Sequence, residues 1–190
     1  MFLFVFIVFL IVLTYHLKKN KIHQQKVIQE FLDKEQTANH TRKQDISQLN
    51  YITIPWEKLP ENVETPSKNA FWALQNKPLL NLTGISNTDL KLQYGVSNLE
   101  VLCECDTNFT EMVSLLPKYA NELMEQGYTS YAKDLLEFGI SCQADSRTIY
   151  FLLADIYKQQ GETDKISLLI DHAQKLPELT KQAVLNQLSV

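Results

Sequence analysis

The chain begins with an almost unbroken apolar run. Residues 1–13 are entirely apolar, and residues 14–17 extend the run before the first charge. A helix that rises about 1.5 Å per residue spans roughly 25 Å over this length, the lower limit for crossing a bilayer. No basic residue precedes the run and no small-x-small cleavage site follows it. We therefore expect a transmembrane anchor at 1–17, rather than a cleaved signal peptide or a buried core helix.

Basic residues follow the apolar run directly. Lys18, Lys19, Lys21 and Lys26 lie just after it, whereas only the terminal amine carries charge before it. Cytoplasmic flanks of membrane helices carry such an excess of Lys and Arg. We therefore expect a single-pass protein of the cell membrane, with its N-terminus outside and its C-terminal domain in the cytoplasm.

A mixed polar and apolar segment comes next. The apolar positions of residues 18–36 are spaced as in a short helix that continues from the anchor. This stripe suits pairing with a second copy of the chain, contact with lipid, or a solvated stalk, and the pattern leaves the three open. Residues 37–50 lose this periodicity, so we expect 18–50 to be a juxtamembrane helix and linker. The stripe consists of Ile22, Val27, Ile28, Phe31 and Leu32.

Residues 51–112 carry signals for short helices and are predicted to form the N-terminal part of the soluble domain. Residues 51–55 alternate like a strand, but a single short strand without partners is better interpreted as an extended segment. Three short helices are expected in 66–106, and an alternating pattern at 99–105 leaves a strand there as the alternative. The helix signals are Thr65-Pro66, the capping pairs Ser86 with Asp89 and Ser97 with Glu100, and the stop signal Gly95.

From residue 113 the sequence repeats itself. Small residues recur at corresponding positions 34 residues apart, and larger apolar residues recur between them. This period is typical of helical-hairpin repeats, in which small residues let helices approach and glycines end the first helix. The matched pairs are Ala120 and Ala154, Gly127 and Gly161, Ala132 and Ile166, Gly139 and Ala173, Leu116 and Tyr150, and Leu136 and Ile170. In the same register Thr129 and Thr163 are expected to cap the second helices.

On these residues, 113–180 resembles two copies of the tetratricopeptide repeat, a pair of antiparallel helices. The first copy, 113–146, departs from the pattern at Pro117, which should bend a helix begun at Asn108 or delay its start to about Ser114. The second copy matches more closely, at Tyr150, Leu153, Ala154, Tyr157, Gly161, Ile170, Ala173 and Pro177. The predicted fold class is therefore all-α, a transmembrane helix followed by a small tetratricopeptide-like domain.

Two repeats leave apolar faces that neighbouring helices must cover. We expect the helices of 66–106 to pack on the first repeat and 181–190 to form a C-terminal capping helix. Apolar residues recur on this Lys- and Gln-rich tail as in a solvent-facing capping helix, at Leu179, Ala183, Leu185 and Leu188. The core of the hairpins should contain Tyr119, Leu123, Tyr150, Leu153 and Tyr157, which recur at helical spacing.

The resemblance also implies a partner-binding groove on one face of the first helix of each repeat. Met124 and Phe151 would be apolar anchors in an otherwise polar trough, a pattern that suits capture of a peptide or partner protein. The alternative is that these side chains are simply solvated. The predicted groove residues are Asn121, Met124, Glu125, Thr148, Phe151, Asp155, Lys158 and Gln159.

Charge and cysteine content narrow the function further. Residues 1–50 sum to a charge of +3 and the remainder to −7. An acidic body without basic clusters repels a phosphate backbone, so we expect no nucleic-acid partner. The odd cysteine count, from Cys103, Cys105 and Cys142, suits a reducing compartment. In that compartment the sequons at Asn39, Asn81 and Asn108 are chance matches.

We find no constellation that predicts catalysis. Cys103-x-Cys105 supplies half of a tetrahedral zinc site, and no histidine has ligand spacing relative to it. We therefore expect no enzyme activity, no metal and no cofactor, with a thiol or metal protein as a remote alternative. The predicted function is a membrane-tethered adaptor that binds a protein or peptide near the bilayer, with self-association through anchor or stalk also compatible. The main alternative is a permanent subunit of a larger membrane complex.

Overall fold

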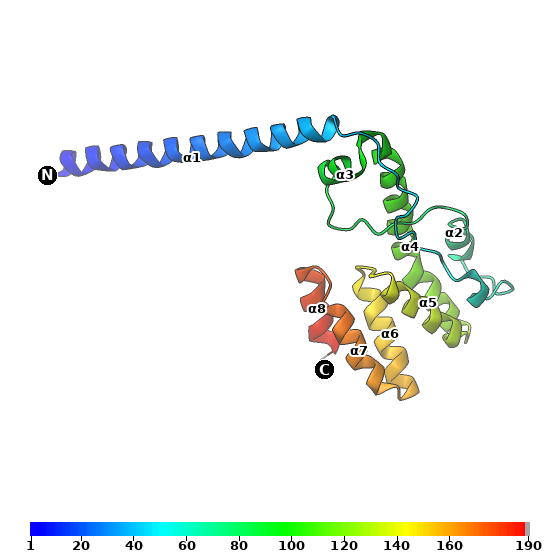
Figure 1. Ribbon diagram of the computed structural model, residues 1–190. Coiled ribbons are helices and arrows are strands. Elements are labelled where there is room, and N and C mark those ends of the chain that lie inside the picture. The colour runs from blue at the N-terminus through cyan, green and yellow to red at the C-terminus, as the bar shows by residue number, and fades with distance from the viewer. Residues whose placement is uncertain (189–190) are drawn as a thin grey trace. The chain divides into compact units, whose positions relative to one another are not determined.

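The computed structural model describes residues 1–188, and every regular element in that range is a helix (Figure 1). This confirms the all-α prediction and the helix, rather than a strand, over 99–105. The chain forms two compact units, which are described separately. Unit 1 contains Met1–Ser47 and Ile85–Glu100, and unit 2 contains Gln48–Gly84 and the chain from Val101 onward.

Unit 1 begins with α1, Phe2–Asn39, a single helix that includes both the predicted anchor and the predicted stalk. Among the described residues it is the one helix long and apolar enough to cross a membrane, and its apolar window is entirely exposed. The linker begins after His40 rather than at residue 37. In the last turns of α1 the Thr37 hydroxyl donates to the Asp33 carbonyl within the helix (2.9 Å).

The second part of unit 1 is α3, Asn87–Tyr94, followed by the 3-10 turn η2, Val96–Asn98. The predicted cap is confirmed, since Ser86 Oγ accepts a hydrogen bond from the Asp89 amide at 3.2 Å. Gly95 ends α3 with a φ of 86°. Ser97, by contrast, lies inside η2 and does not precede a helix as an N-cap would.

A buried asparagine connects α3 to the segment after α1. Asn98 is 1% exposed. Its Nδ2 donates to the carbonyls of Gln44 (2.8 Å) and Tyr94 (2.7 Å). The Gln44 amide in turn donates to the Tyr94 carbonyl at 3.0 Å. These bonds satisfy backbone groups that would otherwise be buried without partners, so residues 40–47 have a defined course.

Unit 2 starts with an irregular segment, the 3-10 turn η1 (Trp56–Lys58) and the short helix α2 (Lys68–Trp72). The helix starts after Ser67, so the predicted start at Thr65-Pro66 lies in the preceding turn. Glu122 fixes this start, because its carboxylate accepts hydrogen bonds from the Ser67 amide (2.8 Å) and hydroxyl (2.7 Å).

The long helix α4, Leu99–Glu125, corrects two expectations. It replaces the third short helix of 66–106, and it includes Pro117 instead of starting near Ser114. Proline removes one intrahelical hydrogen bond. That loss is outweighed because the helix buries apolar side chains along its length, at Leu102, Cys105, Phe109, Met112, Leu116, Tyr119 and Leu123.

The remaining helices of unit 2 follow one another with short connections. They are α5 (Thr129–Ser141), α6 (Arg147–Gln160), α7 (Thr163–Ala173) and α8 (Glu178–Leu188). Gly127 and Gly161 lie at the expected helix ends with φ of 86° and 73°. Thr129 and Thr163 are the first helical residues rather than caps, and the N-cap positions belong to Tyr128 and Glu162.

Gly139 marks a close approach of three helices in unit 2. A Cβ at this position would lie 3.0 Å from Leu116 of α4 and 3.3 Å from Ile149 of α6. The five residues predicted for the core of the hairpins, Tyr119, Leu123, Tyr150, Leu153 and Tyr157, are all buried. The small residues and the apolar period therefore identified the packed faces of these helices correctly.

The C-terminal helix forms where a capping helix was expected, although residues 189–190 of the predicted range lie outside the described residues. Its buried face is Val184 and Leu188. Leu179, one of the recurring apolar residues of the tail, is 88% exposed and is not part of this buried face. It lies in the first turn, five residues before Val184, and a shift of five positions in a helix turns a side chain toward another face.

Candidate partner-binding site

The predicted groove residues occupy two helices of unit 2. Most of them are exposed, as a binding face requires, and Asn121 donates to Glu125 at 2.9 Å within its own helix. Residues 121, 124 and 125 belong to the C-terminal part of α4, and the other five to α6. The exposed members are Asn121, Glu125, Thr148, Asp155, Lys158 and Gln159.

The two apolar anchors differ from the expectation. Met124 and Phe151 are half-buried, and both pack against the hydrophobic core of unit 2. They were expected to turn away from the core, but large side chains next to a buried row lean onto it and lose part of their exposed area. Each residue therefore contributes to packing, and only its remaining exposed part is open to a partner.

The three cysteines of unit 2 differ in their burial. Cys105 is fully buried, whereas Cys103 and Cys142 are half-buried. Residues 103 and 105 lie on one helix, where two positions apart means nearly opposite faces. Burial raises the pKa of Cys105 and Cys142, which favours the unreactive thiol. No group of three potential metal ligands occurs in the described part of the chain.

Two sequon asparagines belong to the packing of unit 2. Asn108 is 6% exposed and donates to the Pro78 carbonyl at 3.1 Å. Asn81 Nδ2 donates to the carbonyls of Cys142 (3.0 Å) and Gln143 (3.3 Å). A glycan on either amide would remove these bonds, which agrees with the interpretation of the sequons as chance matches.

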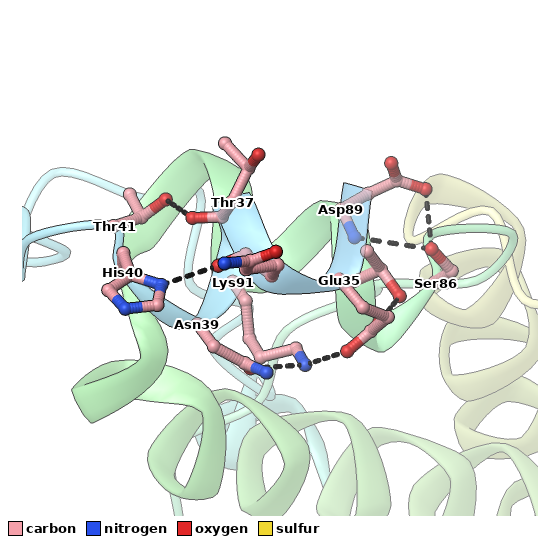
Figure 2. Close-up of polar contacts among 10 residues, drawn as sticks. Glu35, Thr37, Asn39, His40, Thr41, Ser86, Asp89 and Lys91 are labelled. Atoms are coloured by element: carbon pink, nitrogen blue, oxygen red, sulfur yellow. Dashed lines mark hydrogen bonds and ion pairs between the residues drawn. The ribbon is translucent and has the colours of Figure 1, made fainter. Parts of the chain in front are cut away.

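A polar cluster in unit 1 joins the end of α1 to α3 (Figure 2). We call Glu35, Thr88 and Lys91 the α1–α3 clamp. The Glu35 carboxylate accepts from the Thr88 hydroxyl and pairs with the Lys91 ammonium. Lys91 also donates to Asn39 Oδ1 at 2.8 Å. Lys91 is only 9% exposed, so its charge is neutralised within the contact rather than by water.

A second ion pair supports the clamp. Lys34 of α1 lies 2.7 Å from Asp89 of α3, and Ala38 beside it is fully buried. Hydrogen bonds from Lys91 and Thr88 lower the pKa of Glu35, and those from Lys34 and Ser86 lower the pKa of Asp89. Both carboxylates are therefore charged at neutral pH, and α1 is connected to α3 by complementary charges. Sequence patterns missed this contact because its partners are separated by more than fifty residues.

A polar cleft in unit 2 was also missed. It has a volume of about 650 Å³ and lies where the ends of α5 and α7 meet the first turn of α6. Its charged lining residues are Asp145 and Lys175, and its other titratable lining residues are Cys142, Tyr150 and His172. None of the predicted groove residues lines this cleft. No sequence motif predicts this cleft, because its lining residues come from helix ends and loops that lie far apart in the sequence.

Comparison with protein-family models, with curated proteins and with solved structures finds no match for this chain.

Proposed function

We propose that the chain is a membrane-tethered adaptor, in which α1 spans the bilayer and unit 2 captures a protein or peptide on the cytoplasmic side. The observation that carries the proposal is the entirely exposed apolar window of α1. Soluble proteins rarely leave so large a contiguous apolar surface uncovered. A bilayer covers it at no cost to the backbone, because all interior peptide groups of a helix are already hydrogen-bonded.

The direction of insertion is supported by charge. Four lysines lie on α1 directly after the apolar run, Lys18, Lys19, Lys21 and Lys26. Among the described residues only Lys26 of these four has an ion pair, to Glu30 at 3.7 Å. Uncompensated lysines at a span's edge favour the cytoplasmic side. The body therefore faces the cytoplasm, where a free thiol such as that of Cys142 stays reduced.

The partner-binding role is supported by the repeat. The hairpins α4–α5 and α6–α7 end their first helices at Gly127 and Gly161, 34 residues apart, as tetratricopeptide-like units would. The exposed side chains of α6 and of the end of α4 offer a surface for a peptide. Tethering confines partners to a thin layer, so weak binding at this surface is sufficient for capture.

Membrane insertion is tested by placing charge inside the apolar run. In Phe9→Asp combined with Leu10→Asp, the carboxylates cannot reach the interface easily, and each costs about 2.5–3.5 kcal/mol at a span's centre. We expect the wild-type chain in the carbonate-washed membrane fraction and this variant in the supernatant. The matched control, Gln24→Asp with Gln25→Asp, should stay with membranes. A wild-type chain that is released by carbonate would refute insertion.

Partner capture is tested by a photocrosslinking residue at Asp155 of α6, with a control at Asp164 of α7. Both positions are exposed. We expect a discrete crosslinked product in intact cells from position 155 and not from 164. Equal crosslinking from both positions, or none from 155, would mean that the α6 surface is not the binding face. A permanent subunit would differ, because the entire population would migrate in one high-mass complex on native gels.

A further inference from the structure

The polar cleft of unit 2 has walls that are held in place. Asn81 Nδ2 connects one wall to the α5–α6 loop through the carbonyls of Cys142 and Gln143, and its Oδ1 accepts from the Thr83 amide at 3.1 Å. On the neighbouring segment the Ile52 amide donates to the Leu79 carbonyl at 2.9 Å. The cleft is therefore preformed, and its volume of about 650 Å³ lies within the usual range of small-ligand sites.

Opposite charges line this cleft without pairing. Asp145 Oδ1 is fully buried and has no hydrogen-bond partner in the described part of the chain. Lys175 and His172, on the α7 side, have no ion pair with any described residue. A buried carboxylate oxygen without a hydrogen-bond donor destabilises the folded state, because the free energy of desolvating that oxygen is not recovered. The fold thus leaves an acceptor oxygen and a cation of the same lining without an ion pair between them.

Tyr150 adds a donor to the same cleft. Burial and the nearby charge of Asp145 raise the pKa of Tyr150 to about 12. The phenol is therefore protonated at neutral pH and can donate a hydrogen bond to an acceptor in the cleft.

We propose that this cleft binds a small zwitterion, a free amino acid or a short peptide with free ends, whose ammonium contacts the part of Asp145 that lines the cleft and whose carboxylate contacts Lys175 and His172. A simple cation would satisfy Asp145 but meet Lys175, and a simple anion would meet Asp145. Only a ligand with both charges pairs every charged group of the lining. This site is separate from the α4 and α6 surface proposed for protein partners, and either can exist without the other.

Titration calorimetry of the full chain in nanodiscs tests the proposal with defined probes. The probes are L-alanine, tri-alanine, N-acetyl-tri-alanine and tri-alanine amide, the last two lacking one charge each. We expect L-alanine or tri-alanine to bind, the difference between them reporting the charge spacing that the cleft prefers. If tri-alanine binds, we expect blocking either end to weaken binding about tenfold or more, the usual effect of losing a charge-assisted hydrogen bond. No binding of either free probe at millimolar concentration overturns the proposal.

Variants assign each charge. Asp145→Asn keeps the side-chain shape and should make tri-alanine and N-acetyl-tri-alanine bind equally, while amidation still weakens binding. Lys175→Met should do the reverse. The controls Asp171→Asn and Lys118→Met change exposed residues outside the cleft lining and should bind like the wild type. If L-alanine is the only probe that binds, Asp145→Asn and Lys175→Met should each weaken its binding, and the two control variants should not. Equal effects of Asp145→Asn and Asp171→Asn contradict the assignment.

Discussion

Gly95 gives a sharp test of how unit 1 is assembled. Its φ of 86° and ψ of 148° lie in a region that is essentially restricted to glycine. A Cβ built there would lie 2.5 Å from the Arg42 carbonyl oxygen and 2.8 Å from Lys43 Cα. These neighbours are backbone atoms, which cannot rotate away as a side chain can. Gly95→Ala should therefore separate the segment after α1 from the end of α3.

The expected cost has two parts. The backbone conformation costs a non-glycine residue about 1–3 kcal/mol, and forcing an extra methyl group into a packed contact costs about 1–3 kcal/mol. The total is about 2–6 kcal/mol. Gly127→Ala is the matched control, because Gly127 also has a φ of 86° but its Cβ would meet nothing within 4 Å. Gly127→Ala should therefore show only the cost of the backbone conformation and not the steric cost.

Hydrogen exchange at the Gln44 amide measures the effect where it occurs. This amide donates to the Tyr94 carbonyl at 3.0 Å, next to Gly95. Each factor of ten in protection corresponds to about 1.4 kcal/mol. Gly95→Ala should reduce Gln44 protection about thirtyfold or more, or to the unprotected rate, whereas Gly127→Ala should leave it unchanged. Undiminished protection in Gly95→Ala would refute the close approach.

Three further predictions concern unit 2. Ala154→Phe should lower the free energy of unfolding by about 1–3 kcal/mol in denaturant titrations, because it overpacks a buried helix contact; an unchanged midpoint would contradict this. Phe151→Ala should cost about 1–2 kcal/mol, since half of its side chain already packs on the core, and a loss typical of full burial would show that the side chain is not half-exposed. Burial acts to raise the pKa of Glu122, but the hydrogen bonds from the Ser67 amide and hydroxyl outweigh it and lower the pKa below its usual value. The stability that Glu122 contributes is therefore present at pH values above that usual pKa and is lost as the pH falls through the lowered pKa. Glu122→Gln should flatten this part of the acid unfolding curve, and an identical curve would contradict the bond.

Local patterns predicted local structure well. The glycine stops at Gly127 and Gly161, the cap at Ser86 and the buried aromatic positions Tyr119 and Tyr150 follow from helix geometry and from apolar spacing alone. Such features depend on neighbours within a turn or two, which the sequence states directly. The full length of α4 was not predicted, because Pro117 was expected to bend or delay the helix. The sequence alone does not show the tertiary packing that outweighs the hydrogen bond lost at this proline.

Contacts between distant segments could not be predicted. The α1–α3 clamp pairs Glu35 with Lys91, and the polar cleft combines Asp145 with Lys175, and each pair consists of ordinary surface residue types with no periodic signal. The predicted groove failed in one respect for a related reason. Helical spacing gives the direction of Phe151 to within a quarter turn, whereas its burial depends on the particular neighbours that the fold supplies.

The continuity of α1 sets the distance between its N-terminal apolar run and α3. If residues 1–17 occupy the bilayer, residues 18–34 rise roughly 25 Å before the helix reaches α3. A flexible tether of this length would let α3 move freely in all directions above the membrane and touch the lipid surface. A helix instead acts as a spacer of fixed height that also transmits rotation, so turning the span about its own axis turns the clamp and α3 with it. Events within the membrane, such as pairing of two spans, would then reorient α3 without any change in its internal structure.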